Sequence, residues 1–291
     1  MESNPFKPTA GAVPTHLIGR RAVLDEVAES FDNGPGAPAR LALFTGARGI
    51  GKTVMLSEVE ALAQKRGWVT VAETSTPGLA DRLAASLDEA RTQLTQTRPR
   101  FRRIRSVTLP TVLGTGGGGI ELENPASPTA SPSRDYRSSA NRILDAIEPT
   151  GAGLLITIDE VHRKAREDMR EVATSYQHLV REGRNVALVM AGLPSAISDL
   201  LNDAILTFLR RATPFHLGPL DLSDVHAFLD RTIEDSGRTI TPEALSAATD
   251  ATAGYPFMVQ LVGYHIWQRA DHGRITDEAA AAGIAVAIER L

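Results

Sequence analysis

The chain of 291 residues is 42% hydrophobic and 23% charged, a mixture typical of a globular protein with one large or two smaller domains and unlike that of a disordered or fibrous chain. Its 31 basic and 35 acidic residues give a net charge of −4, which argues against a surface covered in positive charge for wrapping nucleic acid. The absence of cysteine excludes disulfides, iron–sulfur clusters, cysteine-ligated zinc and thiol nucleophiles.

The sequence does not predict a membrane protein. Its longest apolar runs, at 154–158 and 186–193, are far shorter than the ~20 residues that a helix needs to cross a bilayer. The first 16 residues contain three prolines and no apolar run behind a basic end, so they do not resemble a signal peptide. We therefore expect a cytoplasmic protein with no membrane partner.

The first hundred residues alternate between helical and extended patterns. Apolar residues at three- and four-residue spacing predict helices, and short runs of consecutive apolar residues predict strands that are buried on both faces. In chain order we expect a helix over 18–31, a strand over 41–45, a helix over 54–65, a strand over 69–73 and a helix over 78–94. This alternation is typical of a parallel sheet with helices on both faces.

The pattern breaks at about 97–135, which we interpret as a flexible insertion. Residues 98–105 include five arginines, and a Ser/Pro-rich stretch ends the segment, as in flexible linkers. The glycines at 114–119 match the sequence pattern of a dinucleotide-binding loop. We do not interpret them as such a loop, because no helix follows them.

The alternation resumes after the insertion. We expect helices over 136–147, 166–182 and 199–209 and strands over 154–158, 186–190 and 214–217. After Leu220 the strand patterns end, and four helices are expected over 223–235, 242–252, 256–270 and 277–290. Thr241 is the expected N-cap of the second helix, and Pro242 is its first residue. The predicted organisation is an N-terminal extension at 1–15, a core at 16–218 and a helical domain at 219–291.

The strongest chemical signal is a complete phosphate-loop pattern (Walker A), G-x-x-x-x-G-K-[ST], between the strand at 41–45 and the helix at 54–65. Its residues are Gly46, Ala47, Arg48, Gly49, Ile50, Gly51, Lys52 and Thr53, followed by Val54. Glycines let backbone N–H groups curl around phosphate oxygens, and the helix that follows adds its positive end. Lys52 would reach the β- and γ-phosphates, and the Thr53 hydroxyl would bind Mg²⁺.

A second signal is the apolar strand that ends in Asp159 and Glu160. A carboxylate at the end of a neighbouring strand can hold the Mg²⁺ shell, and a second one can polarise a water for attack on the γ-phosphate. We therefore expect Asp159 to bind the metal (Walker B). Glu160 is expected to act as the catalytic carboxylate, together with Lys52.

With these motifs the chain resembles the AAA+ family, in particular the branch of origin-recognition-like and STAND ATPases. The stretch 16–21 is similar to an element that lines the adenine pocket in that family, 159–162 to its extended acidic motif, and 254–256 to the G-x-P element of its helical lid. The resemblance implies an α/β, three-layer αβα P-loop NTPase core with a parallel sheet, plus a C-terminal helical lid domain. It also implies nucleotide contacts from Ile18, Gly19, Arg20, Tyr255 and Pro256.

Two cations lie where AAA+ proteins place an arginine finger, just before the last predicted strand. Arg210 or Arg211 would then act on the γ-phosphate of a neighbouring molecule, which implies a homo-oligomer or a protein partner. The alternative interpretation is that cations at a helix end only interact with the helix dipole.

The sequence predicts an ATP-binding ATPase that uses Mg²⁺ and couples its nucleotide state to a partner through lid movement. ATP is preferred to GTP because the guanine motif Asn-Lys-x-Asp is absent. Three alternatives stay open: an ATP switch with little turnover, a DNA-associated initiator or transposition-type ATPase whose arginine-rich insertion contacts DNA, and a small-molecule kinase.

Overall fold

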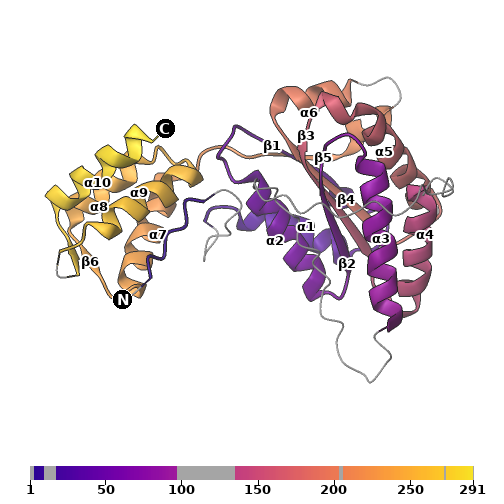
Figure 1. The fold of residues 1–291 in the computed structure, drawn as a ribbon, viewed down its shortest axis with the longest axis horizontal. Coiled ribbons are helices and arrows are strands. Elements are labelled where there is room, and N and C mark those ends of the chain that lie inside the picture. The colour runs from indigo at the N-terminus through magenta and orange to yellow at the C-terminus, as the bar shows by residue number, and fades with distance from the viewer. Residues whose placement is uncertain (1–2, 10–17, 97–134, 203–205, 272, 291) are drawn as a thin grey trace, which may run out of the picture. The chain divides into compact units, whose positions relative to one another are not determined.

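The computed structural model describes residues 3–9, 18–96, 135–202, 206–271 and 273–290. The insertion predicted at 97–135 lies outside this range except for its last residue. The chain forms two compact units, one of Met1–Val27, Phe44–Val59 and Pro214–Leu291 and the other of Ala28–Leu43 and Glu60–Thr213. Figure 1 labels their elements.

A five-stranded parallel sheet has the strand order β2-β3-β4-β1-β5. Its strands are β1 (Leu41–Thr45), β2 (Val69–Thr74), β3 (Leu154–Val161), β4 (Val186–Gly192) and β5 (Thr213–His216). All seven residues of β4 are buried, as expected for a strand that is covered on both faces. The prediction of an α/β fold with a parallel sheet is therefore confirmed.

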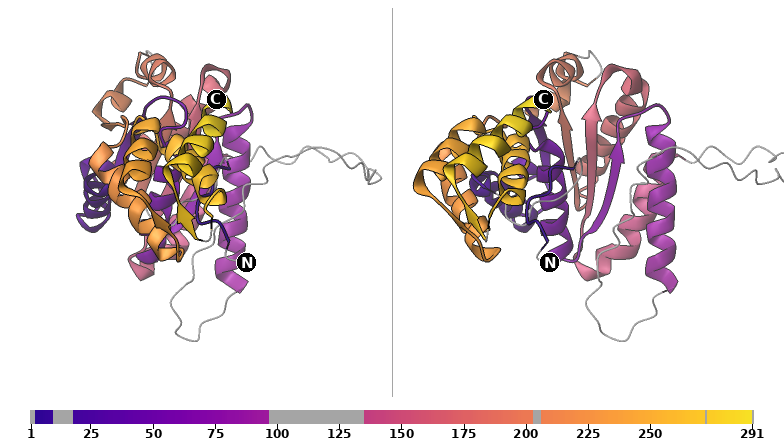
Figure 2. Two further views of the ribbon diagram at one scale, coloured as in Figure 1. Left: turned by 90° about the vertical axis from the view of Figure 1, so that its left-hand side faces the viewer. Right: turned by 60° about the vertical axis from the view of Figure 1, so that its left-hand side comes forward.

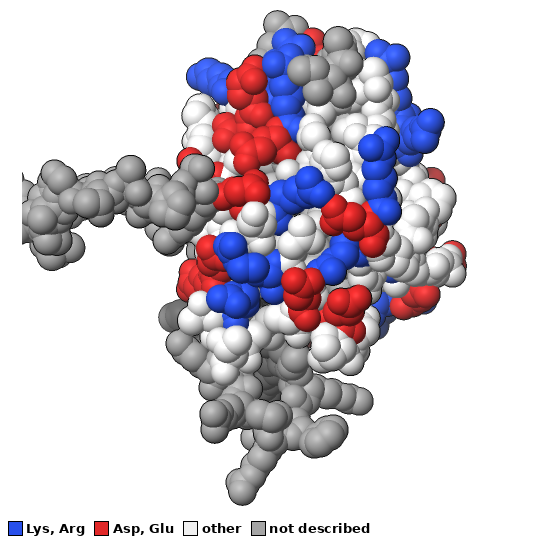
Figure 3. All heavy atoms as spheres, turned by 90° about the vertical axis from the view of Figure 1, so that its right-hand side faces the viewer, with Lys and Arg blue, Asp and Glu red and all other residues white. Residues whose placement is uncertain are grey.

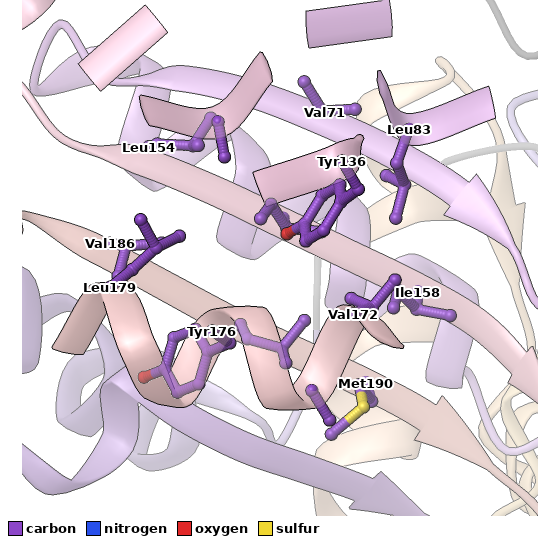
Figure 4. Packing of buried hydrophobic residues seen from close by; sticks show 14 of the residues in the cluster. Val71, Leu83, Tyr136, Leu154, Ile158, Val172, Tyr176, Leu179, Val186 and Met190 are labelled. Carbon is purple, nitrogen blue, oxygen red and sulfur yellow. The ribbon is translucent and has the colours of Figure 1, made fainter. Parts of the chain in front are cut away.

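Three helices cover one face of this sheet: α3 (Leu79–Gln96), α4 (Tyr136–Ile147) and α5 (Arg166–Arg181) (Figure 2). Figure 4 shows their apolar side chains packed against those of β2, β3 and β4 in one buried cluster. The labelled members are Leu83, Tyr136, Val172, Tyr176 and Leu179 from the helices and Val71, Leu154, Ile158, Val186 and Met190 from the strands. Burial of these side chains is the main force that holds the helices on the sheet.

The outer surface of the same helices is a mosaic of both charge signs (Figure 3). Arg142 pairs with Asp88 at 2.9 Å, and Arg137 pairs with Glu182. Exposed pairs of this kind contribute about 0–1 kcal/mol each, so this surface adds solubility more than stability.

The region between β4 and β5 differs from the sequence-based prediction. The helix expected at 199–209 is wrong: α6 spans Pro194–Leu201, and a short 3₁₀ helix, η4, follows at Thr207–Arg211. Pro194 occupies the first turn of α6, a position that suits proline because the N–H it lacks would have no partner there. That signal outweighs the apolar spacing further along the chain.

The C-terminal region consists of α7 (Leu222–Asp235), α8 (Pro242–Ala251), α9 (Pro256–Gln268) and α10 (Asp277–Glu289). The Thr241 hydroxyl accepts a bond from the Ala244 N–H at 3.2 Å, so the predicted cap is confirmed. The expectation that no strand follows Leu220 is wrong, because β6 (Thr239–Ile240) pairs in parallel with β7 (Arg274–Ile275). Two-residue strands are too short to leave an alternating pattern.

The described helices include none with the length and apolar character needed to cross a membrane.

A buried arginine joins several elements of the second unit. Arg40 is 2% exposed and ends the 3₁₀ helix η1 (Pro38–Arg40). It donates to the carbonyls of Ser30 and Phe31 at 2.8 Å each and to the Asn185 side chain, and its guanidinium lies 4.9 Å from the centre of the Trp68 ring. These bonds satisfy carbonyls at the end of α1 (Arg21–Asp32), which the helix itself leaves without partners.

We predict that Arg40→Ala lowers the free energy of unfolding by about 2–4 kcal/mol, because buried carbonyls lose charge-assisted partners. Urea denaturation followed by circular dichroism measures this loss. The control is Arg231→Ala, whose side chain is 77% exposed and whose loss should change stability by less than about 0.5 kcal/mol. Equal effects of the two substitutions would contradict the structural role of Arg40.

The opposite face of the sheet carries a half-buried carboxylic acid. Glu60, on α2 (Lys52–Lys65), accepts a 2.5 Å bond from the hydroxyl of Thr157 on β3. Thr157 is 1% exposed and alternates with Ile156 and Ile158, which belong to the cluster on the other face. Burial raises the pKa of Glu60, the bond from Thr157 opposes this, and the nearby Asp159 carboxylate raises it further.

A raised pKa in the folded state means that protonated Glu60 favours folding, so its contribution is present at low pH and is lost as the pH rises through the folded pKa. Glu60→Gln should therefore increase the free energy of unfolding at pH 8, and this gain should shrink at pH 4. Urea titrations at both pH values test this, with the exposed Glu234→Gln as control. A gain of equal size at both pH values would refute the assignment.

Candidate functional site

The phosphate loop connects β1 to α2 and has the backbone geometry that its glycines permit. Gly49 and Gly51 have φ angles of 73° and 90°, in the left-handed region that strains other residues. A Cβ on Gly46 would lie 2.5 Å from the carbonyl oxygen of Leu217 and 2.8 Å from the Ile50 side chain. The three glycines of the loop therefore meet two physical requirements, a left-handed backbone at Gly49 and Gly51 and a close backbone approach at Gly46.

Lys52 begins α2, and its side chain runs along the loop. Its Nζ donates to the carbonyl oxygens of Gly46 at 2.9 Å and Ala47 at 2.7 Å. The ammonium group is therefore held beside the backbone that forms the loop. A cation in this position suits an anionic ligand bound by the same loop.

The base of the loop is fixed by the segment that follows β5. The Leu217 N–H donates to the Thr45 carbonyl at 2.7 Å, and the Thr45 hydroxyl shares a 2.7 Å hydrogen bond with Nδ1 of His216. Thr45 is buried, whereas His216 is exposed. His216 was not among the predicted site residues, because no local pattern joins it to a residue 171 positions earlier in the chain.

The element at 18–20 lies against the start of the helical region. Gly19 has a φ of 61°, and a Cβ there would lie 3.1 Å from the Asp224 carboxylate. Arg20 donates to the carbonyl of Gly218, and burial lowers the pKa of Arg20. Ile18 packs against the core of the helices. Nucleotide contact by these three residues stays a prediction.

The predicted lid element meets the phosphate loop within the first unit. The Phe257 N–H donates to the Gly49 carbonyl at 3.2 Å, and a Cβ on Gly51 would lie 3.9 Å from the Pro256 ring. Tyr255 and Phe257 are 38% and 39% exposed, so large aromatic surfaces flank Pro256. Phe257 was not among the predicted site residues, since its contact with Gly49 depends on the tertiary fold.

The acidic strand end, in the second unit, has an irregular backbone. Glu160 is exposed and has a φ of 53°, a conformation that costs a non-glycine residue about 1–3 kcal/mol. Its N–H donates to Asp159 Oδ1 at 2.7 Å, and the pairing of β3 with β4 shifts register between Ile158 and Val161. Such strain is concentrated at functional sites, and the sequence gives no sign of it.

Asp159 is held through its backbone. It pairs with Thr74 of β2, and its carbonyl accepts the Ser75 N–H at 2.9 Å. Among the described residues, no group of three or more His, Asp or Glu side chains could hold a metal by itself.

The two predicted finger residues lie at the end of η4, immediately before β5. Both are exposed, and Arg210 Nε donates to the Leu201 carbonyl at 3.0 Å. Action of Arg210 or Arg211 on another molecule stays a prediction.

Several solved structures have a similar fold at low sequence identity. A Walker-type ATPase of Pyrococcus abyssi matches with a TM-score of 0.60 and 15% identity over 94% of this chain and 72% of that one. The Aeropyrum pernix ORC2 protein, solved as ADPNP–ADP complexes, matches with a TM-score of 0.60 and 13% identity. The match covers 96% of this chain and 70% of that one. The Aeropyrum pernix ORC1 protein in complex with DNA matches with a TM-score of 0.57 and 18% identity. The match covers 100% of this chain and 72% of that one.

No curated protein sequence matches this chain. The sequence model of the AAA ATPase domain matches residues 16–190, a segment that contains both the phosphate loop and the acidic strand end. Because this match spans more than half of the chain, the resemblance to AAA+ proteins is confirmed, and the protein belongs to the AAA ATPase domain family.

Proposed function

We propose that the protein binds ATP with Mg²⁺ and hydrolyses it, using nucleotide state to control a partner through the C-terminal helices. The observation that carries this proposal is the phosphate loop, in which left-handed glycines, a close backbone approach at Gly46 and the side chain of Lys52 combine. Family membership and the nucleotide complexes of the Aeropyrum ORC2 protein support the same choice.

The residues present fit a magnesium triphosphate. The loop supplies backbone N–H groups and a cation for phosphate oxygens. Mg²⁺ prefers oxygen ligands and usually keeps several waters while it binds phosphates and one or two protein groups. The Thr53 hydroxyl and the Asp159 carboxylate are donors of that kind, and we assign them to the ion. When bound, Mg²⁺ would offset the negative charge on the β- and γ-phosphates.

Each remaining residue has a separate role in the proposed reaction. Lys52 would bind the β- and γ-phosphate oxygens, and Glu160 would orient a water for attack on the γ-phosphate. The exposure of Glu160 leaves its carboxylate accessible to that water. Ile18, Gly19, Arg20, Tyr255 and Pro256 would surround the adenosine part, and Arg210 or Arg211 would act on a neighbouring copy.

The contact between Phe257 and Gly49 supports coupling between loop and lid. A bound phosphate that shifts the Gly49 carbonyl would alter the bond that holds the first turn of α9. Movement of α9 would then report nucleotide state to a partner.

One specific observation favours a second candidate function. The Aeropyrum ORC1 protein, which has a similar fold, was solved in complex with DNA, so a DNA-associated ATPase is the alternative. The five arginines at 98–105 would be the contacts, and salt-dependent binding to non-specific DNA that disappears when they are neutralised would favour this alternative.

We predict that Lys52→Ala weakens ATP binding about 10–100-fold, because charge-assisted bonds to phosphate are lost. Calorimetric titration with ATP and Mg²⁺ measures the change. Lys65→Ala, at the other end of the same helix, should bind ATP like the wild type. If Lys52→Ala also binds like the wild type, the loop is not the phosphate site.

Glu160→Gln should reduce hydrolysis about 10²–10⁴-fold, because the amide cannot accept a proton from the attacking water. ATP affinity should stay within about threefold of the wild type, because the substitution preserves the shape of the side chain. Single-turnover hydrolysis measures the rate, with Glu234→Gln as the matched control. Equally slow turnover by wild type and Glu160→Gln would contradict the proposed hydrolysis. The protein would then be a switch that binds ATP with little turnover.

A further inference from the structure

The N-terminal segment at residues 3–9 is bound to the helical region of its own unit. Phe6 is 1% exposed, and its ring meets that of Phe228 on α7 edge-on, with centroids 6.3 Å apart. The Asn4 side chain donates to the Tyr264 carbonyl at 3.0 Å, and the Lys7 N–H donates to the Gln260 side chain at 2.9 Å. In Figure 1 this indigo segment runs beside the orange helices.

The Phe6 ring lies directly against a glycine of α9. A Cβ on Gly263 would lie only 2.4 Å from two carbons of the Phe6 ring, so any other residue there would displace the ring. Gln260, Gly263 and Tyr264 are spaced three and four residues apart and therefore share one face of α9. α9 thus presents a polar contact, a glycine that lets the ring approach and a carbonyl contact on the same side.

The bound segment has its own local order. The Phe6 N–H donates to the Asn4 side chain at 3.0 Å, which closes a turn of the kind that asparagine favours. Pro5, between them, restricts the backbone further. A segment that is ordered before it binds loses less conformational entropy on binding.

We propose that this face of α7 and α9 is a peptide-recognition surface specific for an Asn-x-Phe turn, and that the chain's own residues 3–9 are its ligand. A single buried aromatic anchor with a few directed hydrogen bonds is how short peptides are recognised by folded domains. The Phe6 ring supplies the anchor, Asn4 the turn and Lys7 a backbone donor. This surface is independent of the proposed reaction with ATP.

The test uses the full chain with Asn4→Ala and Phe6→Ala, which removes the contacts of the chain's own segment with this surface. A fluorescein-labelled peptide of residues 2–9 should bind this variant in an anisotropy titration. It should bind the wild type at least about tenfold more weakly, because the chain's own segment already covers this surface. A peptide with alanine in place of Phe6 should bind the variant at least about tenfold more weakly, because burial of a phenylalanine side chain contributes that much or more.

The proposal is overturned if the folded variant does not bind the peptide, or if wild type and variant bind it equally. Should the variant fail to fold, cleavage by chymotrypsin after Phe6 decides the question. The wild type should be cleaved at least about tenfold more slowly than the free peptide, and Gly263→Ala should remove this protection. Ile288→Ala, at an exposed position of α10, should keep it. Cleavage of the wild type at the rate of the free peptide would also overturn the proposal.

Discussion

The phosphate loop depends on one close approach between two backbone segments that are far apart in the sequence. The Leu217 carbonyl lies where a side chain on Gly46 would be, and the Leu217 N–H binds the carbonyl of Thr45. A loop that must bind phosphate with backbone N–H groups needs a rigid base, because a mobile loop would lose entropy when the ligand orders it. Glycine at position 46 thus allows the close packing of Leu217 against the loop, while Gly49 and Gly51 allow the left-handed backbone angles that curve it.

A second constraint is the strain at the end of β3. Glu160 adopts a left-handed backbone, and the strand pairing shifts beside it. The bond from its own N–H to Asp159 Oδ1 turns that carboxylate toward the backbone of its neighbour. The surrounding sheet, with buried residues on both faces, is rigid enough to maintain a conformation that an isolated chain would avoid.

Local patterns predicted the parallel sheet and placed the phosphate-loop sequence between a strand and a helix, as β1 and α2 show. β1 and α4 have the predicted bounds, because consecutive apolar residues and apolar spacing identify buried elements without tertiary information. The prediction failed at α6, where proline chemistry determines the start, and at β6 and β7, which are too short for a pattern. Contacts such as Thr45 with His216 and Gly49 with Phe257 join distant segments, and the backbone angle of Glu160 depends on its neighbours in space. None of these leaves a local sequence signal.

The central claim is that the loop recognises the phosphates of a nucleotide. Competition for a fluorescent ATP analogue bound to the wild-type protein in Mg²⁺ tests it most directly, with ATP, ADP, inorganic tripolyphosphate and adenosine as competitors. The account predicts saturable binding of one analogue per chain, displaced by ATP and ADP, measurably displaced by tripolyphosphate, and displaced least by adenosine. Displacement by adenosine as strong as that by ATP, or the absence of saturable binding, would contradict it.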